Sequence, residues 1–352
     1  MAGGLSLSGL YTIQRVSGNV INKKNYSNHM KQIFTLFALV FGVSMAYGQQ
    51  PAQYSLFMMN KLNWNPAYAG MDNSLSATGI YRAQWVGLEG NPITQNANVH
   101  LPLYVFSSGI GINLENDELG AERRTTGTVS YNYQLPVGNR GVLAIGLSAG
   151  MAQRTLDGAK LRTPGGDYNI DASIIIHNDD LLPITQINAT ATTFGAGLYY
   201  YSERFEAGIS ARNLSEPTVN LDAISLELKR AFFFNVSGHF DLNENLSLHP
   251  SALIRSDLAQ TQTDIAAILR YNDNIFGGAS FRGYNSDNID AVALIAGFRL
   301  SEHITVAYAY DLTLSALNQV SNGSHEVMIN YNLNKRLGAG RLPKVIYNPR
   351  TL

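Results

Sequence analysis

Histidine is the residue type in this chain with the broadest catalytic and metal-binding chemistry, and the sequence contains seven. They stand at positions 29, 100, 177, 239, 249, 303 and 325, scattered over different segments. This scatter lacks the close ligand spacing that is typical of metal sites built on one segment. We interpret each histidine as a polar structural residue and expect neither a metal nor any other cofactor.

One acidic segment imitates the start of a calcium-binding loop. Asp167, Asn169 and Asp171 have the alternate spacing of the first three ligands. The sixth position of such a loop requires glycine and the twelfth requires glutamate, but the chain has Ala172 and Asn178 there. The match fails, and calcium in this segment is the minor alternative.

Nucleophilic chemistry also lacks its residues. The chain contains no cysteine, which excludes disulfides, thiol nucleophiles and cysteine-ligated metals. Ser324 and His325 are adjacent, so on a strand their side chains point to opposite faces. The Gly-x-Gly pairs at 109–111 and 195–197 lie inside strand-like segments, where small residues relieve crowding. We therefore expect the protein not to be an enzyme.

The composition indicates a β-protein with little charged surface. Charged residues make up 14% of the 352 residues, against roughly 25% in an ordinary soluble domain. Hydrophobic residues reach 45%, with 32 Gly, 19 Tyr and 14 Phe. The formal net charge of -1 gives no reason to expect a nucleic acid partner.

Alternation of apolar and small or polar residues recurs along the chain. In 142–151, Leu143, Ile145 and Leu147 oppose Gly146 and Ser148. About ten residues with this period suffice for a tilted strand to cross a bilayer. Fourteen segments have this character: 74–82, 94–101, 109–115, 124–135, 142–151, 192–201, 203–212, 228–240, 245–255, 261–271, 275–282, 288–300, 303–311 and 324–333.

The connections between these segments alternate in length. The short ones are 102–107, 136–140, 202, 241–244, 272–274 and 301–302. The others are 83–93, 116–123, 152–191, 213–227, 256–260, 283–287 and 312–323, most of them longer, and one reaches about forty residues. Outer-membrane barrels alternate short periplasmic turns with longer external loops in this way, whereas a soluble exported β-sandwich does not. The sequence therefore predicts an all-β fold, a transmembrane antiparallel β-barrel of about 14 strands over 74–333.

Residues 30–48 have the pattern of an export signal. Met30 and Lys31 precede an apolar run, and small residues stand before Gln49, as in a cleaved secretory signal peptide over 30–48. The alternative is an N-terminal membrane anchor, for which the run is short. We expect 1–29 to be a mis-called, disordered upstream extension, because a signal peptide seldom begins so far inside a chain.

Charged residues inside the predicted strands fall on the non-apolar face, which a barrel turns toward its lumen. They are Arg82, Glu115, Arg212, Arg255, Arg270, Arg299 and Glu326. We interpret them as a structural lumen network, with a specific ion pathway as the alternative. Tyrosines near strand ends, at 81, 133, 271, 310 and 331, are typical of interfacial girdles.

The small inner face of 142–151 leaves room for something to pack inside the barrel. Two segments of this chain are candidates: the lead-in 49–73, which is rich in turn residues and contains a short helical piece around 56–62, and the forty-residue loop 152–191. We predict a lumen that is at least partly filled, with the lead-in lying in the periplasm or in the lumen.

An ordered set of motifs resembles the PorP/SprF family of outer-membrane proteins of the type IX secretion system and gliding machinery in Bacteroidetes. The residues are Asn65, Pro66, Ala67, Tyr68, Ala69 and Gly70, then Tyr81, Arg82 and Trp85, then Gly109-Ile110-Gly111 leading to 116–120, and finally Ser324, His325 and Glu326. The resemblance extends from Gln49 to about Leu333.

The resemblance implies a non-enzymatic barrel in the outer-membrane lipid that assists export or surface attachment of cargo adhesins with type B C-terminal domains. It also implies periplasmic contacts with a peptidoglycan-binding, OmpA-like lipoprotein and with ring or motor components. The alternative from the polar lumen face is a diffusion channel or porin for small solutes; an outer-membrane enzyme is a third class, without a supporting constellation.

The tail 334–352 departs from barrels that end on their last strand with an aromatic residue. It is basic, with Lys335, Arg336, Arg341, Lys344 and Arg350. The predicted topology makes this tail periplasmic, where it serves either as a docking segment or as a solvated or barrel-packed end.

Overall fold

The computed structural model describes residues 51–138, 140–168, 175–285 and 288–335. By their contacts the residues fall into two units, Met1–Gly48 and Gln49–Leu352, and every described residue belongs to the second. The predictions for the upstream extension, for the signal peptide and for the tail beyond Lys335 lie outside the described residues.

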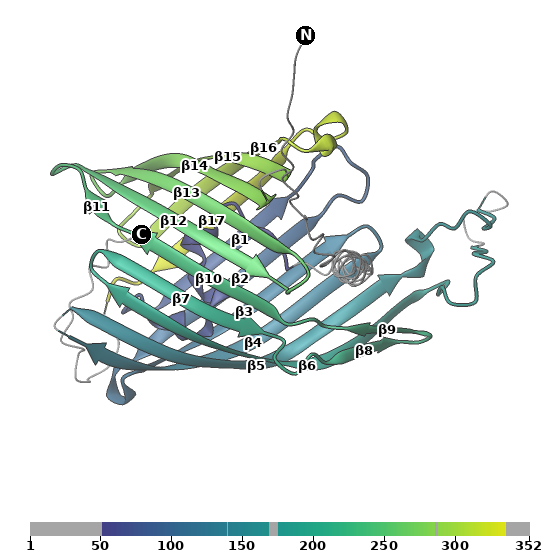
Figure 1. Ribbon diagram of the computed structural model, residues 1–352, viewed down its shortest axis with the longest axis horizontal. Helices are drawn as coiled ribbons and strands as arrows, with labels where there is room; N and C mark the ends of the chain where they lie inside the picture. Colours follow the sequence, from purple (N-terminus) through teal and green to yellow (C-terminus); the bar gives the residue numbers. More distant parts are fainter. Residues whose placement is uncertain (1–50, 139, 169–174, 286–287, 336–352) are drawn as a thin grey trace, which may run out of the picture. The chain divides into compact units, whose positions relative to one another are not determined.

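Fourteen strands form a closed antiparallel barrel, and the two-residue β11 is a fifteenth member of its sheet (Figure 1). Strand β1 pairs with β17, and β10 pairs with β12, which closes the ring. The barrel strands are β1 (Ser76–Ala83), β2 (Ile93–Leu103), β3 (Ser108–Leu119), β4 (Glu122–Val137), β5 (Gly141–Asp157), β6 (Gln186–Ser202), β7 (Phe205–Arg212), β10 (Ala231–Gly238), β12 (Leu246–Ser256), β13 (Thr261–Tyr271), β14 (Ile275–Asn285), β15 (Asn288–Arg299), β16 (Ile304–Thr313) and β17 (Ser324–Asn332). The predicted fold class, a transmembrane barrel of about 14 strands, is confirmed.

The two ends of the barrel differ in their connections. We call the end where β1 leads into β2 the long-loop end, and the end where β2 leads into β3 the short-turn end. The single-turn helix η3 (Tyr104–Phe106) lies at the short-turn end, and η4 (Gly158–Lys160) and η5 (Ala316–Gln319) lie in long loops. No helix in the described part of the chain is long and apolar enough to cross a membrane.

Strand ends differ from the sequence prediction in several places. Strands β3 and β4 stay paired out to Leu119 and Glu122, so the predicted loop 116–123 is a tight turn. Strands β5 and β6 stay paired out to Asp157 and Gln186, so the predicted forty-residue loop is shorter. The predicted loop 213–227 contains a hairpin, β8 (Thr218–Leu221) and β9 (Ile224–Glu227). The segment 228–240 divides into β10 and β11 (Phe240–Asp241), because the N–H of His239 bonds to Arg204 while Phe240 pairs with Leu248 of β12.

The outer face of the barrel has an apolar band with a polar border. On β5, Leu147 is 64% exposed and Ile145 is 46% exposed, whereas Gly146 between them is buried. Beyond Met151 the same face continues with Gln153, and the neighbouring position on β6 is Thr190. Because apolar side chains suit lipid and polar ones suit water, the bilayer ends near Met151 at the long-loop end.

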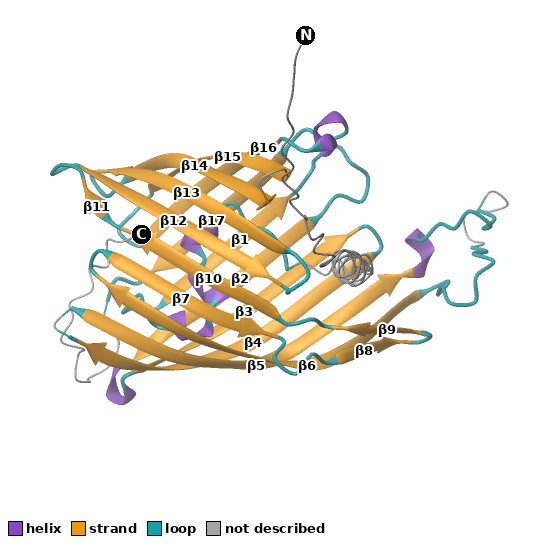
Figure 2. Cartoon of the chain, in the orientation of Figure 1, coloured by secondary structure: helices purple, strands orange, loops and turns teal. Residues whose placement is uncertain are grey.

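Three short helical pieces of the lead-in occupy the interior of the barrel (Figure 2). They are η1 (Phe57–Met59), α2 (Lys61–Trp64) and η2 (Pro66–Tyr68), and the predicted helical piece around 56–62 corresponds to the first two. Their side chains are buried almost throughout, because the strands surround them. The core of this protein is therefore the contact between the lead-in and the inner face of the barrel.

The lipid band can be tested with a charge. We expect Leu147→Arg to lower the free energy of unfolding by about 2–4 kcal/mol, because it places a charge in the hydrocarbon region. The measurement is denaturant unfolding in lipid vesicles. The control is Gln153→Arg on the same strand and face but outside the band, which we expect to be nearly neutral. Equal costs for both variants would contradict the assigned membrane border.

Candidate functional site

The lead-in passes through the lumen from the long-loop end to the short-turn end. Near its start, the carbonyl of Ala52 accepts a hydrogen bond from Arg255 Nη1 (2.9 Å), close to where β12 ends. Near its finish, the N–H of Gly70 donates to His100 Nδ1 (3.0 Å), close to where β2 ends. The chain then enters β1. The prediction of a partly filled lumen is confirmed, and the lead-in is the segment that fills it.

A buried ion network fixes the lead-in near the long-loop end. Arg82 contacts Asp311 Oδ2 at 2.7 Å through Nη2 and Glu326 Oε2 at 3.0 Å through Nη1. The Glu326 carboxylate also accepts the backbone N–H groups of Ser55 (2.7 Å) and Leu56 (3.1 Å). Arg82 is 1% exposed and Glu326 is 0% exposed, so the charges depend on each other and on the lead-in.

The network continues around the barrel wall. Arg282 contacts Asp311 (3.1 Å) and Asp264 (2.8 Å), and Asp264 also contacts Arg255 (2.8 Å). The Ser55 hydroxyl donates to Asp311 Oδ1 (2.6 Å) and lies within 3.1 Å of Arg282 Nη2. Three guanidinium groups thus alternate with three carboxylates around one serine. We call this set, with Ser55 at its centre, the ion clamp: Arg82, Arg255, Arg282, Asp264, Asp311 and Glu326.

Near the short-turn end, the turn 65–70 is fixed to the barrel wall by side-chain amides. Asn65 caps η2 by accepting the N–H of Ala67 (2.9 Å), and its Nδ2 donates to the carbonyls of Leu198 (2.9 Å) and Ile209 (3.2 Å) on β6 and β7. Asn132 on β4 donates to the carbonyl of Ala69 (2.6 Å) and to that of Ala67. Four backbone carbonyls of the turn and the wall are thereby satisfied.

Two glycines make this fit sterically possible. A Cβ at Gly146 would lie 2.4 Å from the Ala67 Cα, so β5 requires a glycine where the 65–70 turn crosses it. Gly70 has a φ of +71°, and a Cβ there would lie 2.7 Å from the Leu101 carbonyl oxygen. The small inner face of β5 that the sequence indicates therefore contacts the lead-in at Gly146.

Aromatic side chains join the two ends of the lead-in. Trp64 packs against Tyr54 (5.5 Å between ring centroids) and against Phe233 of β10 (5.7 Å), and its Nε1 donates to the Phe57 carbonyl (3.0 Å). Arg212 lies over the same ring cluster and donates to Asn63 (3.1 Å). This packing gives the lead-in a hydrophobic centre between polar ends.

Two buried tyrosines donate to carboxylates. The Tyr54 hydroxyl donates to Glu115 (2.9 Å). The Tyr68 hydroxyl donates to Asp72 (2.6 Å). Hydrogen bonds to an ionised acceptor are stronger than those between neutral groups, so both bonds stabilise the buried lead-in.

The remaining motif residues have separate positions. Tyr81 lies on the lipid face, 48% exposed. Trp85 adopts a positive φ of 52° in the first long loop, and its N–H donates to the hydroxyl of buried Ser324 (3.0 Å). His325 is on the outer face near the rim, bonded to Tyr308 (2.7 Å). Of the motif residues outside the lead-in, Arg82 and Glu326 bond to Ser55 of the lead-in. Gly109 and Gly111 also lie against it, since a Cβ at these positions would meet the Ala69 carbonyl and the Leu62 side chain.

Sequence reasoning missed half of the ion clamp. Asp264, Arg282 and Asp311 lie within predicted strands, on the same inward parity as the charged residues that we singled out. Listing every charge of that parity would have found them. Ser55 carries no such signal, because its role depends on where the lead-in lies.

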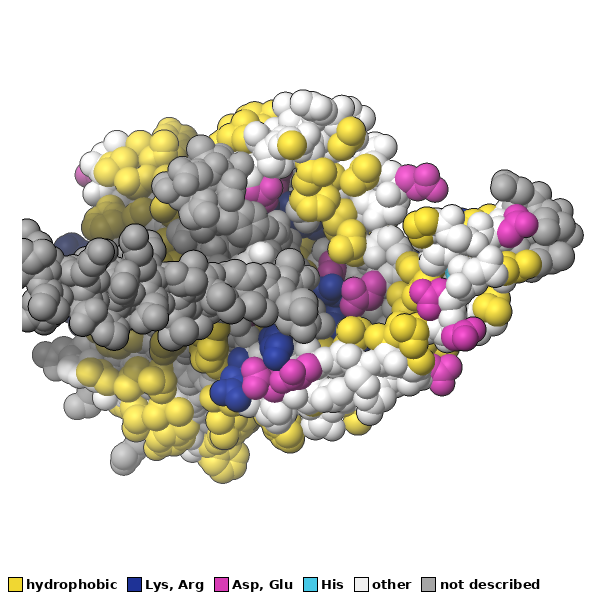
Figure 3. Space-filling model, turned by 45° about the vertical axis from the view of Figure 1, so that its right-hand side comes forward, with side chains coloured by type: hydrophobic (Ala, Val, Ile, Leu, Met, Phe, Trp, Pro, Cys, Tyr) yellow, Lys and Arg dark blue, Asp and Glu magenta, His cyan; other side chains and the backbone are white. Residues whose placement is uncertain are grey.

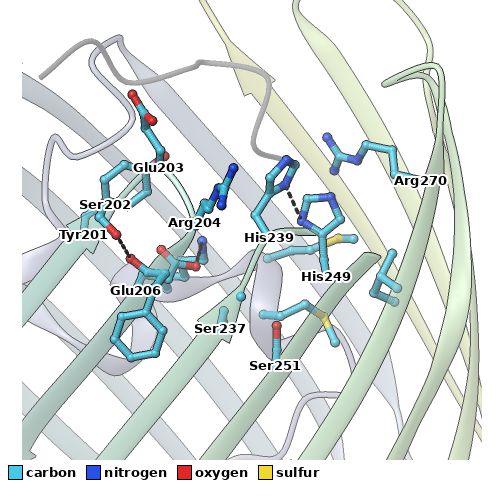
Figure 4. A pocket seen from close by; sticks show the side chains of 16 residues that line it. Tyr201, Ser202, Glu203, Arg204, Glu206, Ser237, His239, His249, Ser251 and Arg270 are labelled. Atoms are coloured by element: carbon cyan, nitrogen blue, oxygen red, sulfur yellow. Dashed lines mark hydrogen bonds and ion pairs between the residues drawn. The ribbon is translucent and has the colours of Figure 1, made fainter. Parts of the chain in front are cut away.

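A pocket opens between the lead-in and the wall at the short-turn end (Figure 4). Its empty volume is about 570 Å³ with the solvent at its mouth, and Met58 and Met59 line it from the lead-in. Lys61 and Glu206 form an ion pair of 2.6 Å across it, and the Nδ1 atoms of His239 and His249 lie 3.4 Å apart. Asp241 bonds to His239 Nε2 at 2.9 Å.

Metal ligation has limited support in the described ranges. No group of three or more His, Asp or Glu side chains within residues 51–138, 140–168, 175–285 and 288–335 is arranged to hold a metal ion. Of the segment that imitates a calcium loop, Asp167 pairs with Ile176 through the backbone, and Asn169 and Asp171 lie outside the described residues. Calcium there stays a hypothesis.

These features define a class: a membrane-spanning β-barrel whose lumen is occupied by its own N-terminal lead-in. The family model described as "Type IX secretion system membrane protein PorP/SprF" matches residues 46–331. The chain belongs to the PorP/SprF family, as its motifs suggest. Among curated proteins, no relative matches it.

Several solved barrels are distantly similar to this chain. The CymD monoaromatic hydrocarbon channel has 13% identity and a TM-score of 0.47, covering 84% of this chain and 97% of its own. The "TodX deltaS2S3 mutant monoaromatic hydrocarbon channel" has 11% identity and a TM-score of 0.43, covering 78% and 94%. The Acinetobacter baumannii outer membrane protein Omp33 has 9% identity and a TM-score of 0.42, covering 74% and 96%.

The ion clamp makes a stability prediction. We expect Arg82→Ala to lower the free energy of unfolding by about 3–5 kcal/mol, because it leaves two buried carboxylates short of a partner. Arg123→Ala is the control, since the Arg123–Glu118 pair (2.7 Å) has side chains 48% and 39% exposed. We expect the control to cost at most about 1 kcal/mol. Denaturant unfolding in vesicles measures both, and a similar small cost for the two would refute the clamp.

Proposed function

We propose that this protein is a non-enzymatic outer-membrane component of the type IX secretion and gliding system. In this role it assists export or surface attachment of adhesins with type B C-terminal domains. It also links the outer membrane to a peptidoglycan-binding, OmpA-like lipoprotein and to periplasmic ring or motor components. Family membership supports the system, and the adhesin and periplasmic partners are the proposal.

The observation that carries the adaptor role is the occupied lumen. The lead-in is held by the ion clamp at one end and by Asn65 and Asn132 at the other, so it is part of the folded barrel. A barrel filled in this way offers a surface at each end and a rigid connection between them. A porin, by contrast, needs a continuous aqueous path.

The short-turn end offers the periplasmic surface. The pocket beside Lys61 and Glu206 opens there. The basic tail begins at the same end, where the N–H of Lys335 donates to the Ser74 hydroxyl (3.2 Å). We propose that the tail is a docking segment for the periplasmic components, with a solvated or packed tail as the alternative.

Gene deletion tests the adaptor role. We expect the deletion strain to keep much of its bulk secretion but to lose one or more type B adhesins from the surface, because the barrel serves a subset of cargo. Surface proteomics of intact cells, before and after complementation with the wild-type chain, measures this. Unchanged surface display of every type B adhesin would refute the proposal.

Conductance separates the adaptor from a solute channel. We expect the wild-type barrel to conduct almost no ionic current in planar bilayers. Gly146→Leu should produce conductance steps, because its side chain occupies the place of Ala67 and displaces the lead-in. Gly79→Leu is the control, since a Cβ at Gly79 meets nothing within 4 Å. Steady porin-like conductance of the wild type would favour the channel instead.

A further inference from the structure

Strand β6 has one edge without a neighbouring strand over its first half. On one side it pairs with β5 along its whole length, from Gln186 to Ser202. On the other side it pairs with β7 only from Ala196 to Tyr201, and the last backbone bond beyond this is from Leu214 N–H to the Phe194 carbonyl (3.0 Å). Among the described residues, no strand of the barrel sheet covers the β6 edge from Gln186 to Thr193.

This free edge lacks the features that usually protect a strand edge. Exposed edges are normally interrupted by lysine, proline, bulges or inward-pointing charges, because unpaired backbone groups attract other strands. The segment 186–193 reads Gln-Ile-Asn-Ala-Thr-Ala-Thr-Thr, without a charge or a proline. Its pairing with β5 also runs in unbroken register. The backbone groups along this edge can therefore form hydrogen bonds with a further strand.

The free edge lies outside the bilayer and is held in place. Its outer face, at Asn188, Thr190 and Thr192, is polar and exposed, beyond the apolar band. Its inner face packs against the β8–β9 hairpin, where Val219 and Leu221 are buried against a cluster that includes Ile187 and Ala189. The hairpin forms a separate two-stranded sheet beside β6. Figure 1 shows β5 and β6 extending past the rest of the rim, next to β8 and β9.

We propose that the free edge of β6 binds an extended strand of an exported adhesin by β-strand addition. The partner strand would continue the barrel sheet in the position that a longer β7 would occupy, bonding through its backbone. An uncharged segment with β-branched residues suits the neutral Asn and Thr side chains beside the edge. The assignment of an adhesin rests on the proposed function, whereas the pairing site rests on the strand geometry.

The surroundings favour a partner at the outer rim of the barrel. Figure 3 shows hydrophobic side chains on the outer wall and acidic and basic side chains in the hollow at the long-loop end. The ion clamp lies near this end, and the lead-in already satisfies its charges. The free edge therefore offers open backbone groups at this end without displacing the lead-in.

A second copy of this chain does not fit the edge. Two barrels in one membrane have their long loops on the same side, so a two-fold axis that relates them lies along the membrane normal. Barrel strands are tilted by about 35–45° to that normal, and the rotation reverses the direction of tilt. The two β6 strands would therefore cross each other instead of running side by side, and no ladder forms.

Site-specific cross-linking tests the contact. The chain has no cysteine, so Thr190→Cys, labelled with a short photoreactive maleimide on intact cells, reports a single site. The control is Thr125→Cys, an exposed threonine in the same cross-strand row, since Thr125 faces Gln153 and Gln153 faces Thr190. Strand β4 is paired on both sides at this level. We expect an adduct containing a type B adhesin from position 190 and none from position 125.

Lysine substitutions test whether the pairing matters. We expect Thr190→Lys to reduce surface-retained adhesin about tenfold, because an edge lysine disfavours strand addition, and Thr125→Lys to leave it unchanged. Heat-dependent gel mobility verifies that both barrels fold. Normal adhesin retention in Thr190→Lys, or equal adducts from both cysteines, overturns the edge proposal.

The gene deletion separates this proposal from the adaptor role. If the deletion removes adhesins while Thr190→Lys does not, the adaptor role stands and the free edge is not its binding site. If the deletion removes none, the adaptor role fails. In that case a position-190 adduct with an exported adhesin would still support the edge, and its absence would overturn it.

Discussion

The arrangement of this protein depends on a set of charges that cannot reach water. Arg82, Asp311 and Glu326 are inside the barrel, and each needs the others to offset the cost of burial. Their remaining bonding capacity is used by the Ser55 hydroxyl and by two backbone N–H groups of the lead-in. The lead-in is therefore a required partner of the wall, because without it Glu326 loses two of its donors.

The opposite end of the lead-in follows a different rule. There the Asn132 side chain of the barrel wall donates hydrogen bonds to backbone carbonyls of the 65–70 turn. Gly146 has no side chain, which lets the turn pack directly on the backbone of the wall. The ion clamp holds one end of the lead-in, and amide hydrogen bonds and steric fit hold the 65–70 turn at the other, with the Trp64 cluster between them. A filled lumen of this kind fits a component that presents surfaces to partners better than one that transmits solutes.

Much of the fold was predictable because side chains alternate between the two faces of a strand, and the outward-facing ones must be apolar where they meet lipid. The fourteen strands follow from alternation alone, and Gly146 pointed to a filled lumen. Strand ends were less predictable: β5 and β6 continue past the membrane with polar outer faces, and the β8–β9 hairpin is only four residues a side. The ion clamp was partly predictable. Parity marks Arg82 and Glu326 as inward, but only the barrel register brings residues 244 apart into contact.

The path of the lead-in has a consequence for how the barrel is made. The lead-in is enclosed by a wall whose first and last strands, β1 and β17, are joined side by side, and Arg82 and Glu326 face each other across that seam. A barrel that had already closed would have to be threaded by its own N-terminal segment. An open sheet can instead receive the lead-in sideways. Placement of Ser55 and closure of the seam are thus coupled in biogenesis, because β17, at the far end of the sheet in chain order, contributes the carboxylate that holds the lead-in.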